Sequence, residues 1–121
     1  MAQKIKAALL EQGSWTLREI ETGLKPLQDI VGGLIQVVPL DTDDVTLYCN
    51  EEGKLLDLPV TTVWIDPKTG RWLDRLAGNM VAFGPANEEG DETDATEATI
   101  AILNRFLIPV VHLEKVTVFS V

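Results

Sequence analysis

The chain has 121 residues, of which 19 are acidic and 10 are basic, so its formal net charge is −9. The length suits one domain spanning residues 1–121, and a hydrophobic content of 45% is ordinary for a globular protein. The acidity argues against direct nucleic-acid binding, because phosphate neutralisation needs a basic patch. Only Lys68, Arg71 and Arg75 come close to a basic cluster.

Cysteine content and hydropathy indicate the compartment. Cys49 is the one cysteine, so no intrachain disulfide can form and nothing points to an oxidising environment. No apolar run approaches the roughly 18 residues that cross a bilayer, and no hydrophobic signal core follows the first lysines. We therefore expect a cytoplasmic protein without membrane contact.

The first predicted elements are a hairpin and a short helix. Apolar residues alternate over 4–11 and recur over 14–21, on either side of a glycine-containing turn, which is the pattern of a β-hairpin. A helix is expected over 22–31, with Thr22 as its N-cap and Gly32-Gly33 at its end. Its apolar face would consist of Leu24, Leu27 and Val31.

The middle of the chain predicts further strands over 34–40, 45–50, 62–65 and 79–83. Residues 55–62 look irregular because Pro59 interrupts them, and Asp66 to Gly70 form a strong turn signal. The strand over 79–83 is bracketed by glycines and is expected at the centre of the sheet.

The last third of the chain begins with an acidic segment. Residues 85–93 are expected to form a solvated loop, and Asp94 with Glu97 to form the capping box of a helix that ends near Phe106. The tail that follows is β-rich, with breaks expected at Pro109 and at residues 114–115.

The order of these elements predicts an α+β fold. We expect a mixed, mostly antiparallel sheet with two helices packed on it, and a β-grasp-like arrangement would suit the first half.

Three stretches in register resemble the family of the domain of unknown function DUF3846. They are Val31 to Val38 (VGGLIQVV), Cys49 to Lys54 (CNEEGK) followed by Leu58-Pro59, and Gly78 to Val81 (GNMV). The resemblance covers about residues 4–84, whereas 85–121 comprise the acidic loop, a helix and a β-rich C-terminal extension. The family brings no established activity, cofactor or catalytic residue. Its members occur in bacteriophages and in the mobile elements of bacteria, so the resemblance implies a phage-encoded accessory protein made in the bacterial cytoplasm.

Few side chains suggest chemistry. Cys49 lies in an alternating strand, where cysteine usually behaves as a small buried hydrophobe, and His112 lies 63 residues away in the tail. These two residues cannot supply a zinc site. The spacing of Asp41, Asp43 and Asp44 fits a calcium loop poorly, and no phosphate-binding glycine motif occurs. We therefore expect no metal, no cofactor and no enzymatic activity.

Several exposed polar or aromatic residues are candidates for an interaction surface instead. The stretch Asn50 to Lys54 reads first as a turn and second as a recognition loop. Trp72 is the tryptophan most expected to be exposed, since it follows Gly-Arg beyond a turn. The candidates are Asn50, Glu51, Glu52, Lys54, Trp72, Glu88, Glu89, Asp91 and Glu92.

The function expected from these features is that of a non-enzymatic accessory protein that binds or modulates a protein of the bacterial host. The C-terminal strand could also pair with another copy of the chain and form a homo-oligomer. The alternative is an oligomeric protein that binds a small molecule such as a nucleotide, although anionic ligands would find few cations here.

Overall fold

The computed structural model describes residues 3–11, 13–52, 58–113 and 116–119. Its elements in chain order are β1 (Lys4–Glu11), β2 (Ser14–Glu21), α1 (Leu24–Val31), β3 (Ile35–Val37), β4 (Thr46–Asn50), β5 (Val60–Ile65), β6 (Trp72–Ala77), β7 (Met80–Phe83), α2 (Glu97–Phe106), β8 (Leu107–Leu113) and β9 (Val116–Phe119). Neither described helix is long and apolar enough to cross a membrane.

The strands form two sheets, and every pairing between described strands is antiparallel. The first sheet has the order β2-β1-β7-β4-β3, and the second has the order β6-β5-β8-β9. The α+β class with two helices is confirmed, but the strands do not share one sheet. The last strand of the first sheet, β7, lies next to β1 as in a β-grasp arrangement, but two features differ from that arrangement. β1 and β7 are antiparallel, whereas the two central strands of a β-grasp are parallel, and β4 instead of β3 lies on the other side of β7.

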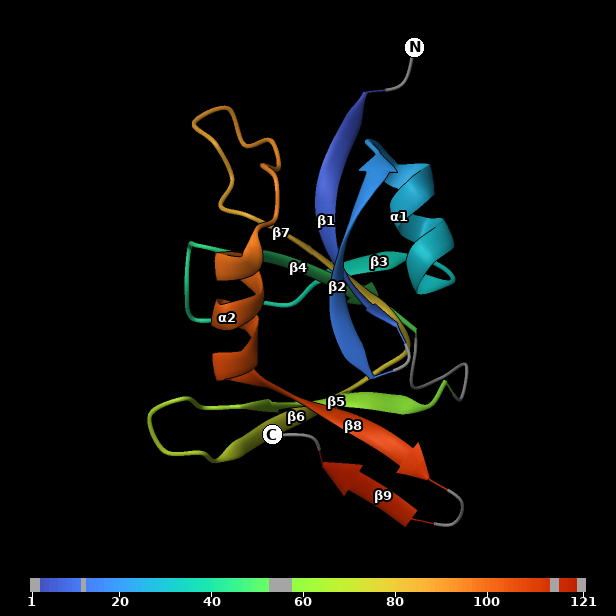
Figure 1. Cartoon of the computed structure of the whole chain (residues 1–121), viewed down its shortest axis with the longest axis vertical. Helices are drawn as coiled ribbons and strands as arrows, with labels where there is room; N and C mark the ends of the chain where they lie inside the picture. The colour runs from blue at the N-terminus through green and yellow to red at the C-terminus, as the bar shows by residue number, and fades with distance from the viewer. Residues whose placement is uncertain (1–2, 12, 53–57, 114–115, 120–121) are drawn as a thin grey trace.

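The five-stranded sheet is the middle layer of the molecule, and its two faces bury different residues. Val81 and Phe83 of β7 pack with Leu27 and Val31 on the α1 side. Alternate residues of a strand point to opposite faces, so Met80 and its partners pack on the other side, against α2 and the second sheet. Figure 1 shows α1 and α2 on opposite sides of the β1–β2 hairpin, with the second sheet below them.

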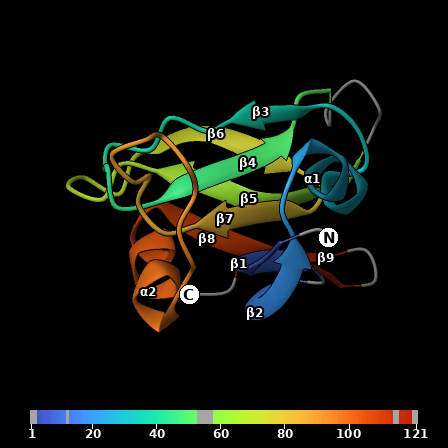
Figure 2. The same ribbon diagram turned by 90° about the horizontal axis from the view of Figure 1, so that it is seen from above.

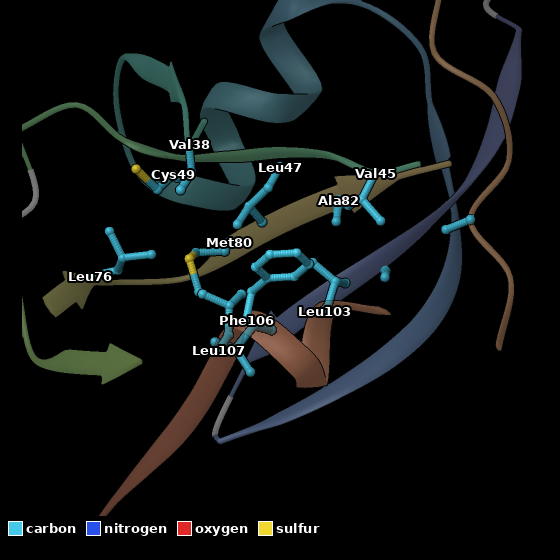
Figure 3. Packing of buried hydrophobic residues seen from close by; sticks show 13 residues of the cluster. Val38, Val45, Leu47, Cys49, Leu76, Met80, Ala82, Leu103, Phe106 and Leu107 are labelled. Atoms are coloured by element: carbon cyan, nitrogen blue, oxygen red, sulfur yellow. The ribbon is translucent and has the colours of Figure 1, made fainter. Parts of the chain in front are cut away.

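The larger core lies between this central sheet, α2 and β8. Leu47 of β4, Met80 of β7 and Phe106 of α2 point toward one another (Figure 3). Figure 2 shows β3, β4 and β7 running side by side. The expectation of a central strand over 79–83 is confirmed, because β7 has β1 on one side and β4 on the other.

The N-caps of both helices differ from the sequence prediction. The N-cap of α1 is Gly23 and not Thr22, whose hydroxyl instead donates to the Gln3 carbonyl oxygen at 3.3 Å. Leu24 is 58% exposed and lies outside the apolar face of α1. The N-cap of α2 is Thr96, which forms a capping box with Thr99.

Asp94 is not the cap of α2 because its carboxylate has another partner. It accepts the backbone N–H of Lys6 at 2.9 Å, while the N–H of Ala95 donates to the Lys6 carbonyl oxygen at 2.8 Å. Residues 94–95 thus continue the hydrogen bonding of β1 beyond the end of β7. A tertiary contact therefore replaces the local cap that the sequence suggested.

The second sheet contains two features that the sequence prediction lacked. β6 was not expected as a strand, and Pro109 does not break the tail but lies within β8, opposite Thr62 of β5. A proline is tolerated in a strand where the neighbouring strand does not need its missing N–H. The predicted break at 114–115 lies outside the described residues.

Candidate functional site

The three stretches that carry the family resemblance meet at the C-terminal end of α1. Asn50 at the end of β4 donates from its side-chain amide to the Val31 carbonyl oxygen at 3.0 Å. Asn79, just before β7, donates to the Ile30 carbonyl oxygen at 3.4 Å. The last carbonyl groups of a helix have no partner within it, so these two asparagines supply what the helix end lacks. We refer to this arrangement as the helix-end junction.

The glycines at the helix-end junction are explained by turn geometry and by close approach. Gly32 has φ of 83°, the left-handed conformation that ends a helix, and its N–H donates to the Gln28 carbonyl oxygen. A Cβ added at Gly33 would lie 3.1 Å from Asn50 Nδ2. Gly78 has φ of 82°, and a Cβ there would lie 2.9 Å from the side chain of Leu58. These spatial constraints account for glycine at all three positions.

Asn50 itself is an internal link and not an exposed recognition group. It is only 5% exposed, and its carbonyl oxygen Oδ1 accepts the backbone N–H of Glu52 at 2.7 Å. Glu51 and Glu52 are exposed beside it in a turn, as the turn interpretation of this stretch predicted. Lys54 lies outside the described residues. The junction therefore presents two carboxylates on a framework fixed from within.

The acidic loop over 85–93 is held by its own hydrogen bonds. Asn87 accepts the N–H groups of Glu89 and Asp91 through Oδ1, and the Thr93 hydroxyl donates to the Pro85 carbonyl oxygen at 2.6 Å. Glu88, Glu89 and Asp91 are exposed, as expected for a solvated loop. Among described residues, no group of three or more His, Cys, Asp or Glu is arranged to hold a metal ion.

Glu92 differs from the other acids of this loop, because it is half-buried and bonded to the sheet. Its carboxylate accepts the hydroxyl of Tyr48 at 2.7 Å. Burial, the hydrogen bond to Glu92 and the negative charge of Glu92 together raise the pKa of Tyr48 to about 12, and burial is the largest of these causes. The tyrosine is thus a neutral donor at physiological pH. It ties the acidic loop to β4.

Cys49 and His112 are separated in the fold. Cys49 is buried in the larger core, consistent with a structural cysteine. His112 lies in β8, in the second sheet, and only its backbone is described.

A second group of candidates lies on the β5–β6 hairpin. The turn over 66–70 is tightly bonded, since Asp66 accepts the N–H of Lys68 through its side chain and that of Gly70 through its carbonyl oxygen. Beyond the turn, the register passes from Ile65 opposite Trp72 to Trp64 opposite Asp74, so Leu73 is the extra residue of a β-bulge. The bulge interrupts the inward–outward alternation. Trp72 and Leu73 are accordingly both exposed, by 55% and 52%.

This hairpin also carries the one cluster of cations that the sequence contains. Lys68, Arg71 and Arg75 are all exposed, and none of them belongs to an ion pair between described residues. A hollow of about 340 Å³ lies next to Leu73, with Trp64, Pro67 and Phe106 in its walls. We define the hairpin surface as Lys68, Arg71, Trp72, Leu73 and Arg75. It is apolar and cationic in a chain whose net charge is −9.

The structure does not bring all predicted site residues together. Asn50, Glu51 and Glu52 lie at the helix-end junction, the acids from Glu88 to Glu92 lie in a separate loop, and Trp72 lies in the second sheet. Sequence reasoning missed Leu73, because no strand was predicted at β6 and no local pattern marks the bulge there. The cations Lys68 and Arg75 were noted as a cluster, but nothing in their spacing joined them to Trp72.

Comparison with known proteins identifies a family over most of the chain. The family model of DUF3846, described as a domain of unknown function, matches residues 5–107. The match extends beyond the three recognisable stretches, through the acidic loop and α2 to the first residue of β8. No curated protein matches the chain, and no solved structure matches it.

Proposed function

The chain belongs to the family of the domain of unknown function DUF3846, and from that premise we propose that it is a non-enzymatic, protein-binding accessory protein. Its partner would be a protein of a bacterial host, in keeping with the phage and mobile-element context that the resemblance implies. The observation that carries the proposal is the hairpin surface, where Trp72 and Leu73 are exposed side by side among three cations.

The chemistry of the hairpin surface suits protein recognition. Tryptophan and arginine are the residue types most often found at the energetic centre of protein interfaces. The hydrogen bonds of the turn fix the backbone next to these side chains, so binding would order little additional backbone. The three cations favour a partner surface that is apolar at its centre and acidic at its rim. They would also speed the encounter with such a partner, despite the overall negative charge.

The test is capture of host proteins by the tagged chain, compared between matched variants. The double variant Trp72→Ser, Leu73→Ser should lose the captured protein, whereas Leu24→Ser should retain it, because Leu24 is equally exposed but lies on α1. Arg75→Glu should weaken capture, and the loss should be larger at low salt than at high salt. Equal capture by all variants would refute the hairpin surface as the binding site. A nucleotide that co-purifies while no protein does would refute the proposal in favour of the small-molecule alternative.

A further inference from the structure

The outer edge of β2 is a second surface, distinct from the hairpin surface. β2 has eight residues, lies at the end of the five-stranded sheet, and pairs with β1 along its whole length. Among the described residues, no strand pairs with its other edge. An open edge of this length offers backbone hydrogen bonds to an extended chain.

The hydrogen-bonding direction along this edge follows from bonds on the far side of β1. The N–H of Lys6 donates to Asp94 and its carbonyl oxygen accepts from Ala95, so the backbone of Lys6 faces away from β2. Along an antiparallel strand, the N–H and C=O groups of successive residues point alternately to one edge and to the other. When a residue points away from its partner strand, the residue opposite it points away as well. Lys6 is opposite Glu19, so Glu19, Leu17 and Trp15 direct their N–H and carbonyl groups to the open edge.

A groove runs beside the start of this edge. It has a volume of about 320 Å³ and lies between Trp15 of β2, Ile100 and Asn104 of α2, and Leu107 and Pro109 of β8. Most of its lining side chains are apolar, and Ser14 and Asn104 are the polar ones. The buried indole nitrogen of Trp15 has no hydrogen-bond partner among the described residues. A chain added antiparallel to β2 would place the side chain of the residue opposite Trp15 on the face that borders this groove.

We infer that this edge and groove bind an extended, cationic segment of a partner protein by strand addition. The residue opposite Trp15 would be apolar and would enter the groove. Four residues earlier in the partner, and on the same face, a lysine or arginine would oppose Glu19, which is exposed. The exposed Glu21 and the net charge of −9 favour the same cationic character.

A second copy of the chain fits this site less well. If two β2 strands paired over most of their length, Glu19 or Glu21 of the copy would lie opposite Trp15 and place a carboxylate at the apolar groove. Only a shorter overlap brings Leu17 of the copy to that position, and two chains of net charge −9 repel each other. The negative charge that repels a second copy attracts a cationic partner.

Synthetic peptides test the inference with the full chain. The probe is a blocked peptide of about ten residues with one leucine, a lysine four residues before it, and serine or threonine elsewhere. Binding should slow amide hydrogen exchange at Trp15, Leu17 and Glu19 and leave Thr16 and Arg18, already paired with β1, unchanged. Replacing the leucine by serine should weaken binding about tenfold, the effect of losing one apolar anchor.

Two matched pairs of changes separate strand addition from other binding. N-methylation of the leucine removes the N–H that would donate to Trp15 and should abolish binding, whereas N-methylation of the preceding residue, whose N–H points away from β2, should not. Asn104→Trp should block the groove, whereas the exposed neighbour change Arg105→Trp should not. Retained binding after leucine N-methylation, or no slowed exchange at millimolar peptide, would overturn the inference.

Two further results have defined meanings. Protection of the same amides without peptide, together with a concentration-dependent dimer, would assign the edge to a second copy and would also overturn it. The double variant Trp72→Ser, Leu73→Ser should leave peptide binding unchanged. Failure of the function proposed for the hairpin surface can therefore be distinguished from failure of strand addition at β2.

Discussion

The side-chain amide of Asn50 donates to the carbonyl oxygen of Val31 at 3.0 Å, and this one bond joins two stretches that are 19 residues apart in the chain. The same amide packs against Gly33, so the end of α1 and the end of β4 form one unit. Asn50 is buried, and its side chain both donates to Val31 and accepts from the N–H of Glu52. Its role is therefore to fix α1 on the central sheet.

Loss of this link should destabilise the domain. Asn50→Ala should lower the free energy of unfolding by about 2 kcal/mol, because it leaves a buried helix-end carbonyl without a donor. Asn79→Ala should cost less than about 1 kcal/mol, since that bond is longer, at 3.4 Å, and half-buried. Urea unfolding of both variants measures the difference. Equal losses would contradict the larger role assigned here to Asn50.

Two adjacent threonines should respond in opposite directions to the same change. Thr62 is fully buried and its hydroxyl has no hydrogen-bond partner among the described residues, so Thr62→Val should raise the free energy of unfolding by about 1 kcal/mol. The hydroxyl of Thr61 donates to the Gly78 carbonyl oxygen at 2.7 Å, so Thr61→Val should lower it by about 1 kcal/mol. Thermal unfolding of the pair is the measurement, and a loss of stability in both would contradict this reasoning.

The acidic loop should depend on the absence of a side chain at Gly84. A Cβ there would lie 2.7 Å from the Asp94 carbonyl oxygen and 2.7 Å from the Thr93 hydroxyl. Gly84→Ala should therefore cost about 1–3 kcal/mol and expose the loop to proteolysis. Ala86→Ser, at an exposed position of the same loop, should change stability by less than about 0.5 kcal/mol. Normal protease resistance in Gly84→Ala would show that the loop can shift freely.

Tyr48 should titrate abnormally, and the chain is suited to the measurement because it contains one tyrosine. The pKa of Tyr48 is raised from 10.0 to about 12 in the folded protein, chiefly by burial and further by Glu92. Tyrosinate absorbance should therefore rise near pH 12 in the native protein and near pH 10 in the denatured one. Glu92→Gln should lower the native midpoint without returning it to 10, because burial remains the larger cause.

The raised pKa of Tyr48 also makes the free energy of unfolding depend on pH at alkaline values. A raised pKa in the folded state means that folding favours the protonated tyrosine. This contribution is fully present below pH 10 and is lost as pH rises toward 12. Tyr48→Phe should lack this part of the alkaline loss of stability. An unchanged alkaline profile in Tyr48→Phe would contradict the assignment.

The sequence by itself determined the local elements whose signals lie within a few residues. The hairpin of β1 and β2, the end of α1 at Gly32 and the turn over 66–70 were all predicted, because alternation and turn residues encode them directly. The exposure of Trp72 followed from its place just beyond a turn. The acidic loop was recognisable from its charge.

Only the tertiary structure decided features that depend on contacts between distant segments. Asp94 pairs with Lys6 and leaves the capping of α2 to Thr96, although the sequence favoured Asp94. Leu73 is exposed at a bulge that shifts the register of β6 against β5, which no local pattern reveals. Similarly, β7 lies beside β1 because the packing of both faces of the central sheet, and not the order of strands in the chain, selects its neighbours.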